Sequence, residues 1–287
     1  MEFLFSVFTP TYNRANTIGR TYEYLCKQTL RSFEWIIVDD GSTDNTEEIV
    51  QKWINTNKIS IVYLKQENGG KHRAFNRAVQ IAKGEIFICL DSDDYYIETA
   101  LEIIYSYHLI HKDNPWIAGF SCNSLDLHGN LIGTSLPVDE LVVSHYNLYN
   151  SLSVKGDKGL IYYTRILKEY PFPEFENEFF VTEALVLNRI SLRYKICCIK
   201  RSLEIKDYQR DGLSSKYRHL CLRNPNGYAL YINERNYFNL SFTNYVINAA
   251  SYVRYSLFAG KSFRNIYKEA INRRWTFIIA CFLGILL

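Results

Sequence analysis

Four short hydrophobic runs alternate with amphipathic stretches along the first ninety residues of the chain. The runs cover residues 3–8, 35–38, 59–64 and 86–90. Each has the length of a strand, and the stretches between them have helical patterns. This alternation is typical of βαβ units, and it predicts an α/β fold with a mostly parallel central sheet flanked by helices.

Each hydrophobic run leads into a polar, glycine-containing or acidic loop. In chain order the loops contain Thr9-Pro10-Thr11-Tyr12-Asn13-Arg14, Asp39-Asp40-Gly41-Ser42-Thr43-Asp44, Glu67-Asn68-Gly69-Gly70-Lys71 and Asp91-Ser92-Asp93-Asp94. Ligands of open parallel sheets bind outside the carboxyl ends of the strands. We therefore expect all four loops to line one crevice.

The acidic loop, Asp91–Asp94, places three carboxylates directly after an apolar strand. Carboxylates this close repel one another unless a cation lies among them. Mg²⁺ and Mn²⁺ prefer oxygen ligands, and Mg²⁺ is commonly held by one or two carboxylates together with substrate phosphates. The loop therefore indicates a metal that binds a diphosphate. The alternative is an acidic turn that caps a helix beginning near Ile97.

The four motifs together resemble those of the family 2 glycosyltransferases of GT-A fold. The resemblance is carried by Thr9–Arg14, Val38–Asp44, Asn68–Gly70 with Ala74 and Asn76, and Asp91–Asp94, in matching order and spacing. It covers about the first hundred residues and fades afterwards, where members of the family vary with their acceptors. It implies nucleotide-sugar chemistry and does not identify the sugar.

The resemblance and the chemistry of the loops define a set of candidate donor-binding residues. They are Thr9, Pro10, Tyr12, Asp40, Gly70, Lys71, Asn76, Asp91 and Ser92. The ring of Tyr12 either stacks on a nucleobase or packs on the end of the sheet. The resemblance implies that Asp40 accepts a hydrogen bond from the uracil imide, whereas Asp39 is expected to support the loop or the ribose. It also implies that Asp93 binds Mn²⁺ or Mg²⁺.

The glycine loop, Asn68–Arg73, is basic and opens a predicted helix, which suits a diphosphate that approaches backbone N–H groups. Phe75 stands where the family commonly has Arg, so Lys71 or Arg73 would supply the positive charge. We expect His72 at the surface rather than in the role of a base. Residues 42–44 are expected to cap a helix that runs to about Asn55.

An inverting transfer also needs a base that takes the proton of the attacking hydroxyl. By resemblance this is an Asp or Glu near the start of a helix, and Glu183 fits best, although Thr182-Glu183 departs from the usual Glu-Asp or Gly-Asp. Three nearby acids compete with Glu183 for this role, and a helix-start carboxylate without chemistry is a further alternative. The competing acids are Glu174, Glu176 and Glu178.

The segment Tyr208–Ser215 resembles a loop of bacterial polysaccharide transferases. It either closes over the diphosphate, with Arg210 or Lys216 on phosphate oxygens, or forms a simple turn and helix cap.

The C-terminal quarter differs in character from the rest. After Ser215 it is predicted to be helical, and residues 254–274 carry six basic residues against one acid. Residues 275–287 then carry no charge, but thirteen residues are too few to span a membrane. We expect domains at 1–213 and 214–287, with the tail as an anchor on an anionic membrane surface. The alternative is a terminal helix that packs on the domain or in a homodimer interface.

Composition limits the function classes. A chain of 287 residues holds one large α/β domain with an appendage, and a net charge of +3 is too small to argue for nucleic-acid binding. Seven scattered cysteines show no zinc-binding spacing, which indicates free thiols in a reducing compartment. The N-terminus shows no signal-peptide pattern. We expect a cytoplasmic protein, peripheral on the inner face of the plasma membrane.

These observations predict a metal-dependent inverting glycosyltransferase that moves sugar from a UDP-sugar to a lipid-linked saccharide of a surface polysaccharide. A membrane-associated protein that binds nucleotide-sugar without turnover is an alternative. A sugar nucleotidyltransferase would need a glycine-rich, basic loop after the first strand, and Thr9-Pro10-Thr11-Tyr12 stands there instead.

Overall fold

The computed structural model describes residues 3–209 and 216–271. The chain divides into two compact units. The first comprises residues 1–171 and 189–210, and the second comprises residues 172–188 and 211–287. The predicted boundary after residue 213 lies outside the described residues. The grouping of residues 172–188 with the C-terminal region differs from the predicted domains.

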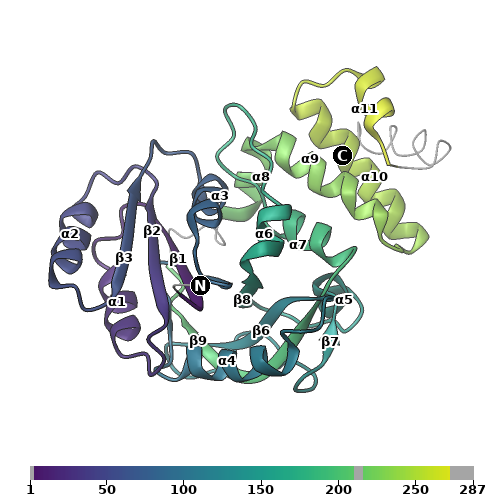
Figure 1. Cartoon of the computed structure of the whole chain (residues 1–287). Coiled ribbons are helices and arrows are strands. Elements are labelled where there is room, and N and C mark those ends of the chain that lie inside the picture. The colour runs from purple at the N-terminus through teal and green to yellow at the C-terminus, as the bar shows by residue number, and fades with distance from the viewer. Residues whose placement is uncertain (1–2, 210–215, 272–287) are drawn as a thin grey trace. The chain divides into compact units, whose positions relative to one another are not determined.

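The first unit is built on one mixed sheet (Figure 1). Its strands lie in the order β3-β2-β1-β4-β8-β6-β9-β5, and β7 pairs with β9. The strands are β1 (Phe5–Thr11), β2 (Phe33–Asp39), β3 (Ser60–Lys65), β4 (Ile86–Cys89), β5 (Tyr95–Tyr96), β6 (Ile117–Asp126), β7 (Val142–Val143), β8 (Lys158–Tyr163) and β9 (Lys195–Lys206).

The four predicted strands are β1 to β4, and they are parallel to one another, as expected. The later half differs, because β8 runs antiparallel to both β4 and β6. The sheet is therefore mixed. No residue of β1, β2 or β4 is exposed, and a strand covered on both faces reads as a continuous apolar run.

In the described part of the first unit, six helices connect these strands. They are α1 (Ile18–Cys26), α2 (Thr46–Thr56), α3 (Lys71–Ile81), α4 (Ala100–His111), α5 (His145–Asn150) and α6 (Thr164–Glu169). Helix α3 packs on β1 and β2, α2 on β3, and α4 on β9. A further helix, α7 (Glu183–Ser191), begins in the second unit and ends in the first.

A buried acid ties the first strands together. Glu34 of β2 is 1% exposed, and its Oε1 accepts hydrogen bonds from Ser6 Oγ at 2.6 Å and from the Lys83 backbone N–H at 2.7 Å. The Ser6 hydroxyl oxygen accepts in turn from Gly84 N–H at 2.8 Å. A buried carboxylate is tolerated only when it is hydrogen-bonded in this way. These bonds join the start of β1, β2 and the entry to β4.

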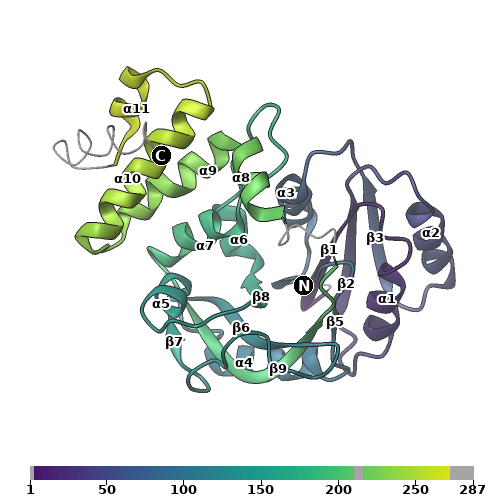
Figure 2. The same cartoon turned by 180° about the vertical axis from the view of Figure 1, so that it is seen from behind.

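The second unit is helical, as predicted for the region after Ser215 (Figure 2). It contains α8 (Tyr217–Arg223), α9 (Pro225–Glu234), the short η2 (Arg235–Tyr237), α10 (Phe242–Phe258) and α11 (Phe263–Glu269). Helices α9, α10 and α11 bury a common cluster of side chains. The cluster consists of Ala229, Ile232, Tyr252, Val253 and Ile266.

Among the described residues, no helix combines the length and the apolarity that a membrane span requires. The predicted anchor at residues 275–287 lies outside the described residues.

Candidate functional site

The carboxyl ends of β1 to β4 meet at one edge of the sheet, as predicted. Three sets of contacts join the loops that follow these strands. Asn13 bonds to the loop after β2, Asp40 bonds to the glycine loop, and Lys71 pairs with Asp91. The four motifs that are separate in the sequence therefore form one continuous region.

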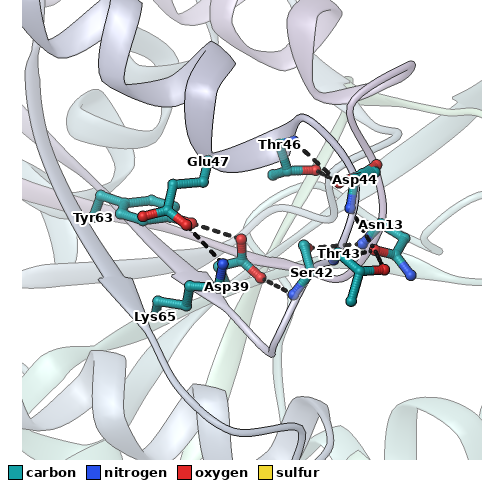
Figure 3. Close-up of polar contacts among 9 residues, drawn as sticks. All are labelled: Asn13, Asp39, Ser42, Thr43, Asp44, Thr46, Glu47, Tyr63 and Lys65. Carbon is teal, nitrogen blue, oxygen red and sulfur yellow. Dashed lines mark hydrogen bonds and ion pairs between the residues drawn. The ribbon is translucent and has the colours of Figure 1, made fainter.

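The loops after β1 and β2 are joined by the side chain of Asn13 (Figure 3). Its Oδ1 accepts hydrogen bonds from the Thr43 backbone N–H at 2.8 Å and the Asp44 N–H at 3.3 Å, and its own N–H donates to Ser42 Oγ at 2.9 Å. Asn13 has a φ of 53°, which asparagine tolerates better than most residues. Asp44 in turn accepts from Thr46 N–H at the start of α2. Residues 42–44 thus have a structural role, but the N-cap residue of α2 is Asn45 and not one of these three.

Asp39 supports the loop, which was one of its two expected roles. Its Oδ1 accepts from Ser42 N–H at 2.6 Å and its Oδ2 from the Tyr63 hydroxyl at 2.6 Å, as Figure 3 shows. Burial, followed by this bond, raises the pKa of Tyr63 far above its ordinary value. Tyr63 therefore remains a hydrogen-bond donor to Asp39 at any physiological pH.

Asp40 shapes the glycine loop. Its Oδ1 accepts from Gly69 N–H at 2.8 Å and Gln66 Nε2 at 2.7 Å, and its Oδ2 accepts from Gly70 N–H at 2.8 Å. Gly70 has a φ of 91°, a conformation that suits glycine. The sequence predicts that backbone N–H groups of the glycine loop face a diphosphate. In the structure the N–H groups of Gly69 and Gly70 donate to Asp40, because a buried carboxylate needs such partners. The donor-binding role of Gly70 stays a prediction.

The packing of Phe75 explains why an aromatic residue stands where the family commonly has Arg. Its ring lies 5.6 Å from that of Phe8 and 5.2 Å from that of Phe87. It therefore packs α3 on β1 and β4, and a charged side chain would lose these contacts.

In the acidic loop, Asp91 is neutralised by a neighbouring lysine. Lys71 Nζ lies 2.6 Å from Asp91 Oδ1. Loss of hydration acts to raise the pKa of Asp91, but the cations Lys71, Lys206 and Arg14 outweigh it and hold this pKa below its ordinary value. Asp91 is thus ionised at neutral pH.

Asp93 differs from Asp91. Burial and the nearby charge of Asp91 raise the pKa of Asp93 to about 6. In the part of the chain that the structure describes, its carboxylate forms no ion pair. A divalent cation would relieve this repulsion, so the residues present fit a metal held by Asp93.

Protein side chains alone would not complete the coordination of this metal. Within residues 3–209 and 216–271, no three His, Cys, Asp or Glu side chains are grouped as metal ligands. A site with one or two carboxylates is what Mg²⁺ and Mn²⁺ use when substrate phosphates complete the coordination.

Asp94 has a structural role, because it forms a buried ion pair with a lysine. Lys206 Nζ, at the end of β9, lies 2.9 Å from Asp94 Oδ2 and 3.3 Å from Glu204 Oε1. The side chains are only 12%, 6% and 2% exposed for Lys206, Asp94 and Glu204. Although burial acts to lower the pKa of Lys206, these carboxylates and Asp91 raise it well above its ordinary value. The buried ammonium therefore stays charged.

The network extends to Arg20 of α1. Asp207 N–H donates to Asp94 Oδ1 at 3.0 Å, and Arg20 Nη2 lies 2.5 Å from Asp207 Oδ2. We did not anticipate Lys206, Glu204, Asp207 or Arg20 from the sequence. They lie far along the chain from the acidic loop, and no local spacing relates them to it.

The remaining residues predicted to bind the donor differ in how deeply they are buried. Tyr12 is 48% exposed, so its ring is available for stacking rather than packed in the core. Pro10 and Asn76 are half-buried, whereas Ser92 is buried. The Thr9 hydroxyl is fully buried and accepts a hydrogen bond from Trp35 Nε1 at 2.9 Å. This side chain therefore serves the core, and the donor-binding role of Thr9 stays a prediction.

The expectation that His72 lies at the surface is also wrong. His72 is 3% exposed, and it stands in the first turn of α3, which packs on β1 and β2. In the sequence His72 stands between two charged residues, which is typical of a surface position. In the structure it lies on the face of α3 that packs on the sheet.

Glu183, the predicted base, is the first residue of α7 and belongs to the second unit. Of its competitors, Glu178 is 4% exposed and is already bonded through both oxygens. These accept from Asn226 N–H at 2.6 Å and Gly227 N–H at 2.9 Å. Glu178 therefore caps α9, while Glu174 and Glu176 are exposed. The role of Glu183 stays a prediction.

The predicted closing loop is described only as far as Gln209. Tyr208 donates its hydroxyl to Asp157 Oδ2 at 2.8 Å and is 53% exposed. Residues 210–215, with Arg210, lie outside the described residues. Lys216 directly precedes α8.

Comparison with known proteins agrees with this geometry. Residues 6–125 match the sequence profile of glycosyl transferase family 2. This region is therefore similar to that family, and the fold of the chain is GT-A.

Among curated relatives, the chain is 35% identical over 149 residues to glycosyltransferase GlyG of Streptococcus pneumoniae, covering 50% of this chain and 48% of that protein. It is 32% identical over 200 residues to the poly(ribitol-phosphate) β-N-acetylglucosaminyltransferase TarS of Staphylococcus aureus, covering 66% of this chain and 34% of TarS. The chain thus spans about half or less of the length of these relatives.

Solved structures support the fold. The TarS 1–349 structure in complex with UDP-GlcNAc superposes with a TM-score of 0.60 at 22% identity, covering 96% of this chain and 79% of that one. A mannosyltransferase from Pyrobaculum calidifontis, in complex with GDP-Man and Mn²⁺, gives 0.57 at 16% identity, covering 98% and 87%.

Proposed function

We propose that this protein is a metal-dependent inverting glycosyltransferase that uses a UDP-sugar as donor. The observation that carries the proposal is the acidic loop at the shared edge of β1 to β4. There Asp91 and Asp94 are paired with lysines, whereas the Asp93 carboxylate forms no ion pair among the described residues. UDP as the nucleotide rests on the similarity to TarS, which binds UDP-GlcNAc and UDP.

The residues of this edge have distinct tasks in donor binding. The exposed ring of Tyr12 stacks on the base, and Asp40, held by the glycine loop, presents an acceptor to the uracil imide. Lys71 and Arg14 supply positive charge near the diphosphate. A divalent cation on Asp93, Mn²⁺ or Mg²⁺, supplies the remaining counter-charge when bound.

Glu183 takes the proton from the attacking hydroxyl of the acceptor. The acceptor is proposed to be a lipid-linked saccharide of a surface polysaccharide, at the inner face of the plasma membrane. This part of the proposal rests on the basic and apolar C-terminal sequence and on the similarity to TarS, a poly(ribitol-phosphate) β-N-acetylglucosaminyltransferase.

The test is a donor screen followed by substitution of the base. UDP-, GDP- and dTDP-sugars are compared for nucleotide release with and without Mn²⁺, and UDP-sugars are expected to be selected. Glu183→Gln keeps the size of the side chain but cannot take a proton, so turnover should fall by about 100-fold or more while UDP affinity stays near normal. Glu174→Gln and Glu176→Gln are the matched controls, and both should retain turnover. Near-native turnover of Glu183→Gln would reject Glu183 as the base.

A further inference from the structure

The backbone that leads into Glu183 is held by the corner between α8 and α9. We call residues 178–182 the strap. Asn224 lies between the two helices and is 4% exposed. Its Oδ1 accepts hydrogen bonds from Phe179 N–H at 2.6 Å and Phe180 N–H at 3.1 Å, and its Nδ2 donates to Leu220 O at 2.7 Å. One buried side chain thus fixes two successive residues of the strap to the end of α8.

A second contact fixes the beginning of the strap. Glu178 accepts hydrogen bonds from Asn226 N–H and Gly227 N–H, which lie in the first turn of α9, where N–H groups have no acceptor within the helix. A carboxylate is favoured there because the N-terminus of a helix carries partial positive charge. Pro225 opens α9 and lacks an N–H, so these N–H groups are the first that this helix offers.

The end of the strap is packed as closely as its beginning. A Cβ on Gly227 would lie 3.0 Å from Val181 Cγ2 and 3.3 Å from Phe180 O, so a side chain there would press on the strap. Val181 is 4% exposed and Thr182 is 7% exposed. The Tyr217 hydroxyl, at the start of α8, lies 3.5 Å from Thr182 Oγ1.

We propose that Asn224 is a positioning residue for sugar transfer, through which the C-terminal helices fix the strap and hence the place of Glu183. The inference rests on the proposed function, in which Glu183 acts as the base. Its physical basis is that Phe179 to Glu183 is a short stretch of chain. A displacement of the two anchored N–H groups is therefore transmitted to the start of α7. The C-terminal helices are then part of the transfer apparatus and more than a membrane attachment.

The test compares Asn224→Ala with Asn233→Ala. Asn233 is a matched control, because it is also buried, at 5% exposure, and its side chain bonds two backbone groups, against three for Asn224. Its Nδ2 donates to Glu269 O at 2.9 Å and its Oδ1 accepts from Ile271 N–H at 3.0 Å, so it ties α9 to the end of α11 and makes no bond to the strap. Asn224→Asp is the rescue variant, since it keeps the acceptor oxygen for Phe179 and Phe180.

Two measurements are made on the full-length protein. Hydrogen exchange of the Phe179 and Phe180 amides should become at least tenfold faster in Asn224→Ala and stay unchanged in Asn233→Ala. With a UDP-sugar and acceptor, kcat should fall at least tenfold further in Asn224→Ala than in Asn233→Ala. The KM for the donor should stay within twofold in both, and Asn224→Asp should recover much of the lost kcat.

Each outcome decides the matter. Unchanged amide exchange in Asn224→Ala overturns the inference, and so does faster exchange with a loss of kcat no larger than that of the control. In both cases the glycosyltransferase proposal survives when the wild-type protein transfers sugar in the same assay. If the wild-type protein transfers no sugar from any donor, the proposed function fails and the positioning role fails with it.

Discussion

At the scale of single residues, the three carboxylates of the acidic loop differ in what neutralises them. Asp91 pairs with Lys71 and Asp94 with Lys206, whereas Asp93 has no ion pair in the described part of the chain. The same residue type thus has separate roles within four positions. The sequence predicted the cluster and singled out Asp93, but it did not predict Lys206, which lies more than a hundred residues away.

Asp93→Asn should remove the metal-dependent part of donor affinity, because an amide of similar size brings no charge to the cation. Isothermal titration with a UDP-sugar, in the presence and absence of Mn²⁺, measures this part directly. Asp113→Asn, an exposed position in the loop after α4, is the control and should keep the full Mn²⁺ effect. An unchanged Mn²⁺ effect in Asp93→Asn would show that the metal, if any, binds elsewhere.

Lys206→Met should destabilise the protein by about 3–5 kcal/mol, because two buried carboxylates, on Asp94 and Glu204, lose their cation. Urea unfolding measures the loss. The control is Lys65→Met, which breaks the 2.6 Å pair with Glu47 at the surface and should cost much less, since both side chains are hydrated. Adding Glu204→Gln to Lys206→Met should restore part of the stability. Equal losses in the two lysine variants would contradict the buried network.

At the scale of elements, the apolar runs predicted the parallel strands β1 to β4 well, because strands covered on both faces carry a strong signal. The antiparallel insertion of β8 between β4 and β6 was not predicted. Its pairing depends on contacts between distant segments, which no local pattern records. The wrong expectation for His72 has the same cause, since the contacts of α3 with β1 and β2 determine which face of the helix is buried.

Helix α4 gives the protein a pH-dependent contact with β8. His108 is 4% exposed, its Nδ1 lies 3.2 Å from the Tyr163 hydroxyl, and its Nε2 lies 4.0 Å from Glu85. Burial lowers the pKa of His108, and Lys112 adds to this, while Glu85 and Asp113 act in the opposite direction. The folded protein therefore binds this proton less readily than the unfolded chain does.

A lowered pKa in the folded state means that the unfolded state takes up the proton first as the pH falls. Stability from His108 is therefore present above a pH of about 6.5 and decreases as the pH falls below it. His108→Gln should flatten this dependence. Urea midpoints of both proteins at pH 7.5 and pH 5 test it, and an equal loss in the two would show that His108 does not contribute.

At the scale of the whole molecule, the second unit joins segments that the sequence analysis had assigned to different domains. Residues 172–188 belong with the C-terminal helices through Glu178 and Asn224. The sequence suggested a boundary where the composition changes, but composition does not reveal that an earlier segment caps α9. The predicted base is therefore in the same unit as the C-terminal helices.

This arrangement changes how the proposed membrane anchor is tested. A deletion from residue 262 would remove α11, whose Ile266 is fully buried against Tyr252 and Val253, and it would expose the core of the second unit. A deletion of residues 272–287 ends just after Ile271, which donates its N–H to Asn233, and spares that core. The shorter deletion therefore isolates the uncharged tail from the fold.

Removing residues 272–287 should release the protein from anionic vesicles, because the tail carries the uncharged apolar stretch and two of the six basic residues that precede it. Flotation of full-length and shortened protein is compared at low and high salt. The full-length protein should float in both, with partial loss at high salt, since only the electrostatic share of binding is screened. The shortened protein should keep its thermal midpoint and its donor affinity. If the shortened protein floats as well as the full-length protein, the tail is not the anchor. If the full-length protein does not float and is a dimer, while the shortened protein is a monomer, the tail is a dimer interface.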